Sequence, residues 1–532
     1  MVRNIGVLGV AVAALSLAAC GSDSPTGTVS TATDRGTLVD NPPLRVASLD
    51  AADFTAQLNA TASGPQLLEL AGTPTCGVDF YYIKYWTVGP DGSAQLASAA
   101  LMVPTGAAAP CTGPRPIVLY AHLTTTDSAY NIADISDSSN SANAESAMIA
   151  TVFAAQGDIV VAPNYLGYDI STLGYHPYLD GAANASDMID ALTAARMALR
   201  STFTPNTSDD GQLYVTGYSE GGYVAMATVK AMQAAGDVVT ASAPSSGPYA
   251  LEAFGDAIFF GQVDIGSTEF APLTTTSYQH VYGNVYTQPS DVYSATYASN
   301  IATLLPSTTP IDALFQDGQL PETALFDSST PTSSTGNALL DATADALLAL
   351  PTSPPYTPSL AALFDLGFGN PYLVNNTYRV AYVDVALANP DAAEMTLLGG
   401  GTLDESDAGL ATGGLEVGLR ADLALNDMRA GPWSPEEPML LCGGDADPTV
   451  FFQNAQIMAA WWTPYVQGGL ISVLDLNAAP QAGNPFAPLQ EGLQDAEAQL
   501  VAANGAAAIA SYHATEVPFC MVAARDFFAK VP

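Results

Sequence analysis

Short apolar runs alternate with longer amphipathic stretches through much of the chain. The short runs are rich in Val, Ile, Leu and Ala, and turn residues bound them, which predicts buried strands. The longer stretches space their apolar residues as helices do. Strands are expected at 116–122, 158–162, 212–217 and 238–243, with helices at 142–156, 182–200 and 220–235. This alternation is typical of a mostly parallel sheet with helices on both faces.

A β-hairpin is predicted ahead of the alternating region. Residues 78–87 and 95–103 are apolar, aromatic or β-branched, and the sequence Gly-Pro-Asp-Gly at 89–92 between them is a strong turn signal. We therefore expect residues 45–115 to be rich in β-strands.

The alternation stops after residue 249. Residues 250–435 are rich in Leu, Ala, Pro, Thr and Tyr and show no strand–helix rhythm, so they predict a large, mostly helical cap or lid insertion. Core patterning returns with strands expected at 439–442 and 470–474 and helices at 451–462, 489–510 and 518–529. The α/β core is therefore expected in two parts, 45–249 and 436–532.

Tyrosines recur every four residues in one part of the predicted cap. Tyr278, Tyr282 and Tyr286 have this spacing, which on a helix would form one aromatic face. Such a face could line an acyl or aromatic pocket, or it could pack the cap onto the sheet.

The first residues predict export. Arg3 precedes an apolar run, residues 5–19, that is shorter than the roughly 20 residues of a membrane-spanning helix. The run ends in Leu-Ala-Ala-Cys, which resembles a bacterial lipobox, where the signal is removed before the cysteine and the cysteine is lipidated. We expect a lipoprotein signal peptide at 1–19 and a lipidated flexible tether at 20–44, anchored to a membrane through Cys20. An ordinary signal peptide with an incidental cysteine is the alternative.

The location of the expected lipoprotein is indicated by the residue after the lipidated cysteine. Gly21, rather than Asp, follows Cys20. By resemblance to Gram-negative lipoproteins, this favours the outer membrane or the cell surface.

Composition excludes several classes of function. The chain has 13 Lys and Arg against 52 Asp and Glu, and this net charge of −39 repels nucleic-acid phosphates, so no nucleic-acid partner is expected. It has four histidines, none in H-E-x-x-H spacing, and no EF-hand loop. We therefore expect no catalytic metal and no cofactor.

A candidate nucleophile lies at a predicted strand–helix junction. Residues 217–221, Gly-Tyr-Ser-Glu-Gly, fit the pattern G-x-S-x-G, and they follow a β-branched strand and open an Ala-rich helix. In a nucleophile elbow the small residues allow the sharp turn that holds the serine in a strained position, and the helix N-terminus favours developing negative charge. We interpret Ser219 as the nucleophile; a glycine-rich turn with an incidental serine is the alternative.

A serine nucleophile needs a histidine base and a carboxylate that orients the histidine. In enzymes with this elbow the chain order is Ser, acid, His. His513 is the one histidine that follows the strand expected at 439–442, and we expect it in a loop between two helices. The acid should follow the same strand, where Asp447 is the first candidate and Asp445, which could instead cap the turn, is the second.

The remaining four cysteines predict two disulfides, because an exported chain with an even number of cysteines favours pairing. Cys442 lies shortly before Asp447 and Cys520 shortly after His513. If the acid and the base meet, these cysteines are neighbours, and their bridge would help to hold both catalytic loops. The predicted pairs are therefore Cys442–Cys520 and Cys76–Cys111.

An oxyanion hole needs two backbone N–H groups aimed at the charge that forms on the carbonyl oxygen. Glu220 directly follows the nucleophile, so its amide is the first expected donor. The second should come from the loop after the strand at 116–122, where either Leu123 or Thr124 could donate.

Together these stretches resemble the α/β-hydrolase superfamily, and most of all bacterial lipases and esterases related to the secretory lipases. Besides the elbow and the segments of Asp447 and His513, the resemblance is carried by 162–168 (APNYLGY), 174–179 (GYHPYL) and 246–249 (SGPY). Many members have Gly-x-x-Asp-x-x-Val after the corresponding strand, the register of Asp447. Relatives usually have glycine where this chain has Leu123.

The resemblance implies an α/β-hydrolase fold and a serine carboxylic-ester hydrolase, an esterase or lipase that forms an acyl-enzyme from an ester substrate. A serine peptidase of the same fold is one alternative, although residues 250–435 show no evident acidic pair for a peptide amino terminus. A non-catalytic surface-binding lipoprotein that kept the fold is another. The complete Ser, Asp, His order argues against it.

Overall fold

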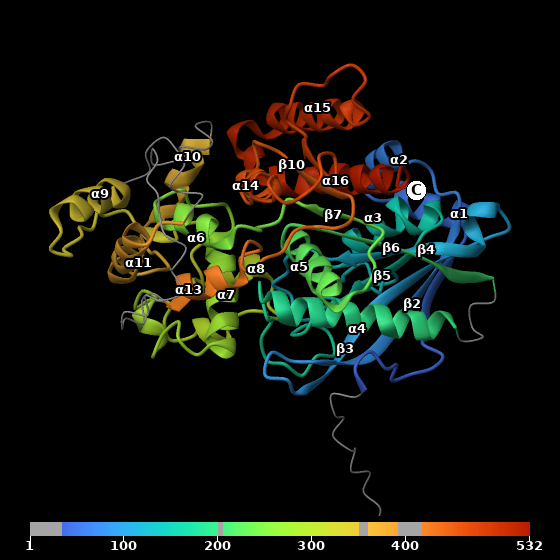
Figure 1. Ribbon diagram of the computed structural model, residues 1–532, viewed down its shortest axis with the longest axis horizontal. Coiled ribbons are helices and arrows are strands. Elements are labelled where there is room, and N and C mark those ends of the chain that lie inside the picture. The colour runs from blue at the N-terminus through green and yellow to red at the C-terminus, as the bar shows by residue number, and fades with distance from the viewer. Residues whose placement is uncertain (1–33, 201–205, 350–359, 392–417, 532) are drawn as a thin grey trace, which may run out of the picture.

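The computed structural model describes residues 34–200, 206–349, 360–391 and 418–531 (Figure 1). One large sheet lies at its centre. The strands of this sheet are β1 Leu44–Leu49, β2 Gly77–Val88, β3 Ala94–Thr105, β4 Gly113–Ala121, β5 Ile159–Pro163, β6 Thr207–Tyr218, β7 Ala241–Ser245, β10 Met439–Gly443 and β11 Ile471–Asp475.

The sheet contains nine strands in the order β1-β2-β3-β5-β4-β6-β7-β10-β11. β1, β2 and β3 form an antiparallel edge, and β3 also pairs antiparallel with β5. From β5 to β11 all pairs are parallel. The predicted mostly parallel sheet is therefore confirmed.

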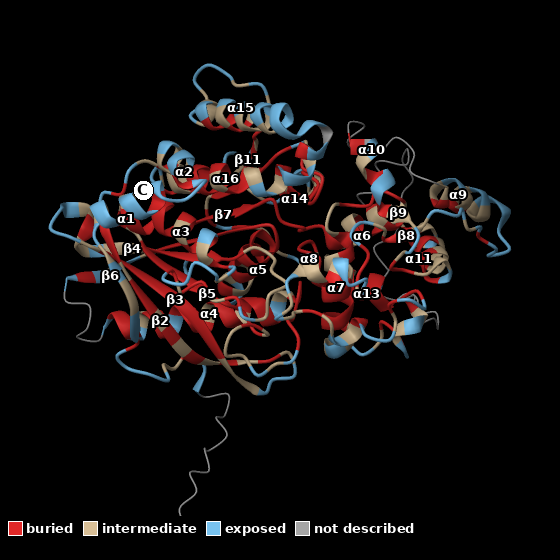
Figure 2. Ribbon diagram, turned by 180° about the vertical axis from the view of Figure 1, so that it is seen from behind, coloured by how far each residue is buried: buried red, intermediate tan, exposed pale blue. Residues whose placement is uncertain are grey.

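Helices flank the sheet throughout the core. They are α1 Ala51–Asn59, α2 Gly64–Ala71, α3 Asn143–Val152, α4 Gly181–Leu199, α5 Glu220–Ala235, α14 Gln453–Trp462, α15 Ala487–Asn504 and α16 Tyr512–Phe528. α4 and α5 contact each other and the sheet, and α16 contacts α3 together with β6, β7 and β10. Every residue of β5, β7 and β10 is buried, so helices cover both faces of the central strands (Figure 2).

The predicted hairpin is formed by β2 and β3. Val88 pairs with Ala94 at its end, and the Gly89 amide donates to the Ser93 carbonyl oxygen at 2.8 Å. Gly92 has a φ of +77°, a left-handed conformation that favours glycine.

The end of the segment predicted as a tether belongs to the sheet edge. The Gly36 amide donates to the Trp86 carbonyl oxygen and the Val39 amide to the Lys84 carbonyl oxygen, each at 2.8 Å. β1 then begins at Leu44. The flexible tether expected at 20–44 is therefore wrong for residues 36–39 and for Leu44, because their backbone pairs with β2. Cys20 and the predicted signal peptide lie outside the described residues.

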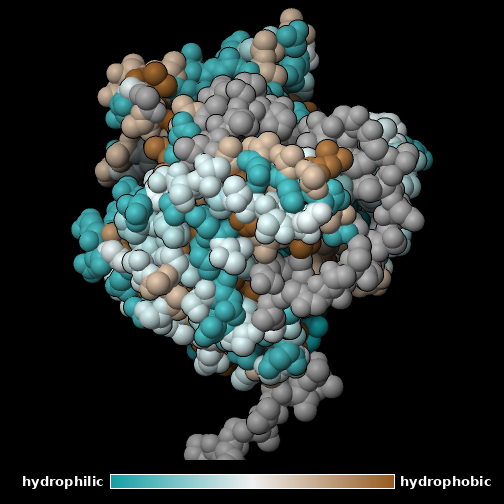
Figure 3. Space-filling model, turned by 90° about the vertical axis from the view of Figure 1, so that its left-hand side faces the viewer, coloured by the Kyte–Doolittle hydropathy of each residue, from teal (hydrophilic) through white to brown (hydrophobic). Residues whose placement is uncertain are grey.

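The insertion after β7 lies at one end of the core (Figure 1). Its helices are α6 Leu251–Phe259, α7 Ser267–Val281, α8 Ile311–Gln316, α9 Ala338–Leu348, α10 Ala361–Phe364, α11 Asn376–Ala388 and α13 Gly418–Asn426, with a small sheet of β8 Phe326–Asp327 and β9 Phe368–Gly369. Figure 3, which views this end, shows mainly hydrophilic and intermediate residues with scattered hydrophobic ones. We call this insertion the cap.

The tyrosine rhythm does not form one helix face. Tyr278 lies in α7, which ends at Val281, and Gly283 with a φ of +73° follows that end. Tyr286 therefore lies outside the helix, although both tyrosines are buried.

Among the described residues, no helix is long and apolar enough to span a bilayer.

Candidate active site

Ser219 lies at the tight turn between β6 and α5. Its φ of 60° and ψ of −125° are strained for a residue with a side chain, and its amide donates to the Ser245 carbonyl oxygen at 3.0 Å. A Cβ atom at Gly217 would lie 2.3 Å from the Gly221 carbonyl oxygen, and one at Gly221 would lie 2.1 Å from the Ala121 carbonyl oxygen. The two glycines of the motif are needed because α5 begins almost in contact with β4.

The predicted acid and base are in direct contact. His513 Nδ1 lies 2.6 Å from Asp447 Oδ2, and the Asp447 side chain is fully buried. The other oxygen, Oδ1, accepts from the amides of Thr449 at 2.9 Å and Val450 at 3.3 Å. Asp445, the alternative acid, is exposed. The geometry therefore favours Asp447 as the partner of His513.

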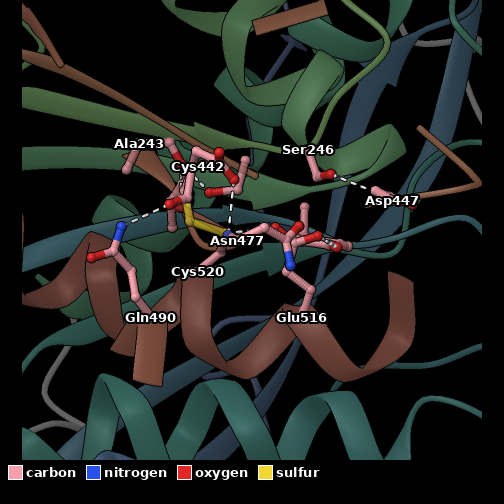
Figure 4. Close-up of a disulfide and its surroundings, with 12 residues drawn as sticks. Ala243, Ser246, Cys442, Asp447, Asn477, Gln490, Glu516 and Cys520 are labelled. Carbon is pink, nitrogen blue, oxygen red and sulfur yellow. Dashed lines mark hydrogen bonds between the residues drawn. A yellow bond between two sulfur atoms is a disulfide. The ribbon is translucent and has the colours of Figure 1, made fainter. Parts of the chain in front are cut away.

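Ser246 is a further partner of this carboxylate. Its hydroxyl donates to Asp447 Oδ2 at 2.9 Å, a bond drawn in Figure 4. Ser246 has a φ of 42°, and its amide donates to the Cys442 carbonyl oxygen at 2.7 Å. In the sequence it stood out only within the segment 246–249, which carried the resemblance but gave it no role.

His513 is oriented to present its second ring nitrogen. With Nδ1–H donated to Asp447, Nε2 carries the lone pair that a general base needs. Nε2 is buried, and it has no hydrogen-bond partner within the described residues, Ser219 Oγ included. In structures without substrate the serine–histidine hydrogen bond is often long, and it shortens when substrate binds.

The loop predicted around His513 is wrong. His513 lies in the first turn of α16, which begins at Tyr512 and contains Pro518. Proline favours the first helical position, so Pro518 predicted a later start. The helix starts earlier, which fixes the histidine on a rigid element.

Tyr218, the residue before Ser219, connects the elbow to this helix. Its hydroxyl donates to the His513 carbonyl oxygen at 2.8 Å and lies 3.1 Å from Glu516 Oε2. Burial, with a smaller effect of the Asp447 charge, raises the pKa of Glu516 well above its usual range. Burial and the nearby Asp447 charge therefore both favour the neutral form of the Glu516 carboxyl group.

Both predicted disulfides are confirmed. Cys442–Cys520 joins the strand that precedes Asp447 to the helix that carries His513 (Figure 4). Glu516 Oε1 lies 3.7 Å from Cys520 Sγ, but both sulfurs of this group are in the disulfide and offer no thiolate to a metal. Cys76–Cys111 ties the start of β2 to the segment before β4.

The backbone amides expected to form the oxyanion hole differ in whether they already donate a hydrogen bond. The Glu220 amide opens α5, where the helix itself offers it no acceptor. The Leu123 amide donates to Glu145 Oε1 at 3.1 Å, so Leu123 is wrong as an oxyanion donor. The Thr124 amide donates no hydrogen bond within the described residues, and Thr124 Oγ1 lies 3.1 Å from the Tyr178 hydroxyl.

Glu145 explains why the Leu123 amide is occupied. Its carboxylate also accepts from the Tyr120 and Tyr130 hydroxyls, each at 2.6 Å. This buried group fixes the loop after β4 without the glycine that relatives usually have at Leu123. No local pattern indicated a contact between residues 22 positions apart.

A buried histidine–carboxylate contact supports the turn that contains Glu220. Glu220 Oε1 lies 2.6 Å from His176 Nε2, and both side chains are fully buried. His176 Nδ1 lies 2.7 Å from the Leu166 carbonyl oxygen. The pair joins the start of α5 to the segment 174–179, which the sequence marked by resemblance alone.

A cavity of about 100 Å³ opens beside Ser219 and Glu220, between the core and the cap. Its walls are mostly apolar and come largely from α6, α7 and α13. These residues include Leu251, Phe254, Ile258, Phe259, Phe270, Leu419 and Leu423. An apolar pocket with few polar groups beside a reactive residue is typical of a small-molecule site.

No protein-family model matches the chain, and no curated protein matches it by sequence. Solved structures do match. The rice cell wall degrading esterase LipA from Xanthomonas oryzae, in a ligand-bound form, is 25% identical, with a TM-score of 0.64 over 94% of this chain and 100% of that one. A mutant of the same esterase has the same values. A candidate hydrolase from Legionella pneumophila is 18% identical, with a TM-score of 0.59 over 93% of this chain and 98% of that one, a likeness of fold alone. The chain therefore has the α/β-hydrolase fold and is related to the esterases that share it.

Proposed function

We propose that this protein is a serine carboxylic-ester hydrolase with Ser219 as nucleophile, His513 as base and Asp447 as the residue that orients the base. The observation that carries the proposal is the 2.6 Å contact between His513 and Asp447 on elements next to the strained elbow. The Tyr218–His513 hydrogen bond supports it, because it ties the helix of the base to the residue before the nucleophile.

In the acylation step His513 Nε2 removes the proton from Ser219 Oγ as the oxygen attacks the ester carbonyl carbon. Asp447 stabilises the imidazolium that forms. The amides of Glu220 and Thr124 donate to the oxyanion, which is typically worth about 3–4 kcal/mol for each donor. The tetrahedral intermediate then collapses, and His513 returns the proton to the leaving alcohol.

Deacylation repeats these steps with water. His513 removes a proton from a water molecule, whose oxygen attacks the acyl carbon bound to Ser219. Collapse of the second intermediate breaks the bond to Ser219 Oγ and releases the carboxylic acid. His513 returns its proton to Ser219, and the enzyme is restored without any cofactor.

The apolar cavity supports an ester substrate with an apolar chain, because it offers little to the polar backbone of a peptide. The likeness to an esterase supports the same class of reaction. We propose a carboxylesterase or lipase on these grounds.

The test is hydrolysis of p-nitrophenyl esters from acetate to palmitate by the chain from residue 21 onward. We expect turnover of at least one ester, and its loss in Ser219→Ala to background. Ser136→Ala, at an exposed serine, is the matched control and should keep wild-type activity. An inert wild type, or an active Ser219→Ala, would overturn the proposal.

We also propose that Cys20 is lipidated and anchors the protein to a bacterial outer membrane or cell surface. Its support is the sequence of residues 3–21. Metabolic labelling with an alkyne fatty acid should label the wild type and not Cys20→Ala, and the variant should leave the membrane fraction. Equal labelling of both proteins would contradict lipidation at this cysteine.

A further inference from the structure

Asp264 is an ionisable side chain in the apolar wall beside Ser219. It lies in the connection between α6 and α7 and is 4% exposed. The Ser267 hydroxyl donates to one of its carboxylate oxygens, Oδ1. The neighbouring Ile265 amide donates to the Pro448 carbonyl oxygen at 3.0 Å, which ties this connection to the segment that follows Asp447.

Two threonine hydroxyls of the wall are already paired. Thr274 Oγ1 donates to the Phe270 carbonyl oxygen at 2.8 Å, and Thr275 Oγ1 bonds the Tyr293 hydroxyl. The Glu220 carboxylate is held by His176 through Oε1, and its buried Oε2 has no hydrogen-bond partner within the described residues. Asp264 Oδ1 accepts from Ser267, whereas Oδ2 makes no hydrogen bond within the described residues and lies in the cavity wall, where a ligand can reach it.

The environment of Asp264 favours a neutral carboxyl group. Burial, with a smaller effect of the Asp447 charge, raises the pKa of Asp264 to about 7. Near neutral pH this group can therefore donate a hydrogen bond as well as accept one. A carboxyl group in an apolar wall is costly while one of its oxygens lacks a hydrogen bond, and a ligand could supply that bond.

The wall fits a hydroxyl better than an ammonium group. An ammonium group carries three N–H donors and loses strong hydration when it is buried. Asp264 offers it one oxygen, because Ser267 occupies the other. A hydroxyl needs one or two partners, and the apolar side chains around it suit the rest of an alkyl chain.

We propose that Asp264 binds a hydroxyl group on the chain of the ester, so that the enzyme selects hydroxylated esters over unsubstituted esters of equal length. Asp264 is then a specificity-determining residue that acts on binding of the chain and not on the reacting carbonyl. This inference rests on the proposed ester hydrolysis and names its substrate class.

The test compares kcat/KM within three pairs of esters. On the acyl side, p-nitrophenyl 3-hydroxyhexanoate and p-nitrophenyl 6-hydroxyhexanoate are each compared with p-nitrophenyl hexanoate. On the alcohol side, 6-hydroxyhexyl butyrate is compared with hexyl butyrate. We expect the wild type to prefer the hydroxylated member of at least one pair, and Asp264→Leu to reduce that preference about 10- to 100-fold, as loss of a hydrogen bond to a charged or polar partner does.

Two variants separate binding from folding. Asp264→Asn keeps the shape and hydrogen-bonding capacity of the side chain, so it should retain part of the preference for hydroxylated esters. It serves as the test variant if Asp264→Leu misfolds. Glu269→Gln makes the same carboxyl-to-amide change in the first turn of α7, outside the cavity wall, and should leave the preference unchanged.

The failures of the two proposals differ. If the wild type hydrolyses no ester, the proposed function fails. If the wild type is active and Asp264→Leu changes both members of every pair equally, the ester hydrolase stands and the role of Asp264 is overturned. A preference for p-nitrophenyl 6-aminohexanoate that depends on Asp264, with none for the hydroxylated esters, would likewise overturn the hydroxyl assignment.

Discussion

The core and the cap contribute to the candidate site in different ways. The core supplies backbone positions that tolerate almost no change, since a Cβ atom at Gly221 would lie 2.1 Å from the Ala121 carbonyl oxygen. The cap supplies side chains of α6, α7 and α13 that line a cavity. This difference suggests that the core fixes the reaction and the cap fixes the substrate, because side chains can change while the backbone keeps its course.

The largest expected effect is the loss of catalysis when a catalytic residue of the core is replaced. His513→Ala should lower kcat by about 10⁴- to 10⁶-fold, as the loss of a triad histidine does. Its thermal unfolding should stay close to that of the wild type, because the side chain is partly exposed and at the start of its helix.

The matched control for His513 is His280 in the cap, which is exposed and stacks on Tyr175 with ring centroids 4.1 Å apart. His280→Ala should keep wild-type kcat on short esters. Substantial activity in His513→Ala would contradict the assignment of the base.

The two disulfides sharpen the comparison within the core. Replacing Cys442 and Cys520 by alanine should lower the free energy of unfolding by about 2–5 kcal/mol and also lower kcat, because this bridge joins the elements of Asp447 and His513. Replacing Cys76 and Cys111 should cost similar stability and leave kcat unchanged at 25 °C. Urea unfolding and ester kinetics of the two double variants check this. Equal kcat values for the two double variants would mean that the Cys442–Cys520 bridge does not position the catalytic residues.

The contribution of Asp264 in the cap to the stability of the folded protein should depend on pH. Because the pKa of Asp264 in the folded state is about 7, above the ordinary value near 4, the folded protein holds an extra proton between these values. The stability of the wild type relative to Asp264→Asn should therefore fall as the pH rises from about 4 to about 7, by at most about 4 kcal/mol. Urea unfolding of both proteins at pH 5 and pH 7.5 measures the change.

A carboxyl group with the opposite shift is the control for this measurement. Hydrogen bonds, that of the Thr335 side chain first, lower the pKa of the half-buried Asp341. The difference between wild type and Asp341→Asn should therefore stay constant from pH 5 to pH 7.5. A constant difference for Asp264→Asn as well would contradict its raised pKa.

The smallest expected effect comes from a substitution in the cap that leaves the catalytic residues unchanged. Ile258→Trp adds bulk to the cavity wall and should lower kcat/KM for the longest esters about tenfold, within the range for a misfit in an apolar pocket. Acetate hydrolysis should change by less than about twofold, because an acetyl group needs little of the cavity. A parallel loss on acetate and palmitate would show that the cap and the reacting groups are not separable.

The sequence predicted the core well because its signals are local. The alternation of strands and helices predicted the sheet, and the elbow could be recognised because glycine is required within a few residues of Ser219. The chain order identified His513, but Pro518 misled the helix boundary, since the packing of α16 outweighed its preference for a helix start.

The features that the sequence missed depend on contacts between distant residues. Glu145 occupies the Leu123 amide, and His176 holds the Glu220 carboxylate from 44 residues away. Asp264 looks like any acidic residue in an acidic chain until the fold buries it beside Ser219. Hydrophobic periodicity carries no information about such pairs, so the cavity and the buried Asp264 in its wall required the structure.

The central claim is that Ser219 is the nucleophile of a hydrolase, and covalent trapping tests it most directly. Diethyl p-nitrophenyl phosphate should add one diethylphosphoryl group per chain, abolish ester hydrolysis, and leave the label on the peptide that contains Ser219 in mass spectrometry. The label should be absent from Ser219→Ala. A label on another residue, or an active enzyme that takes up none, would contradict the account.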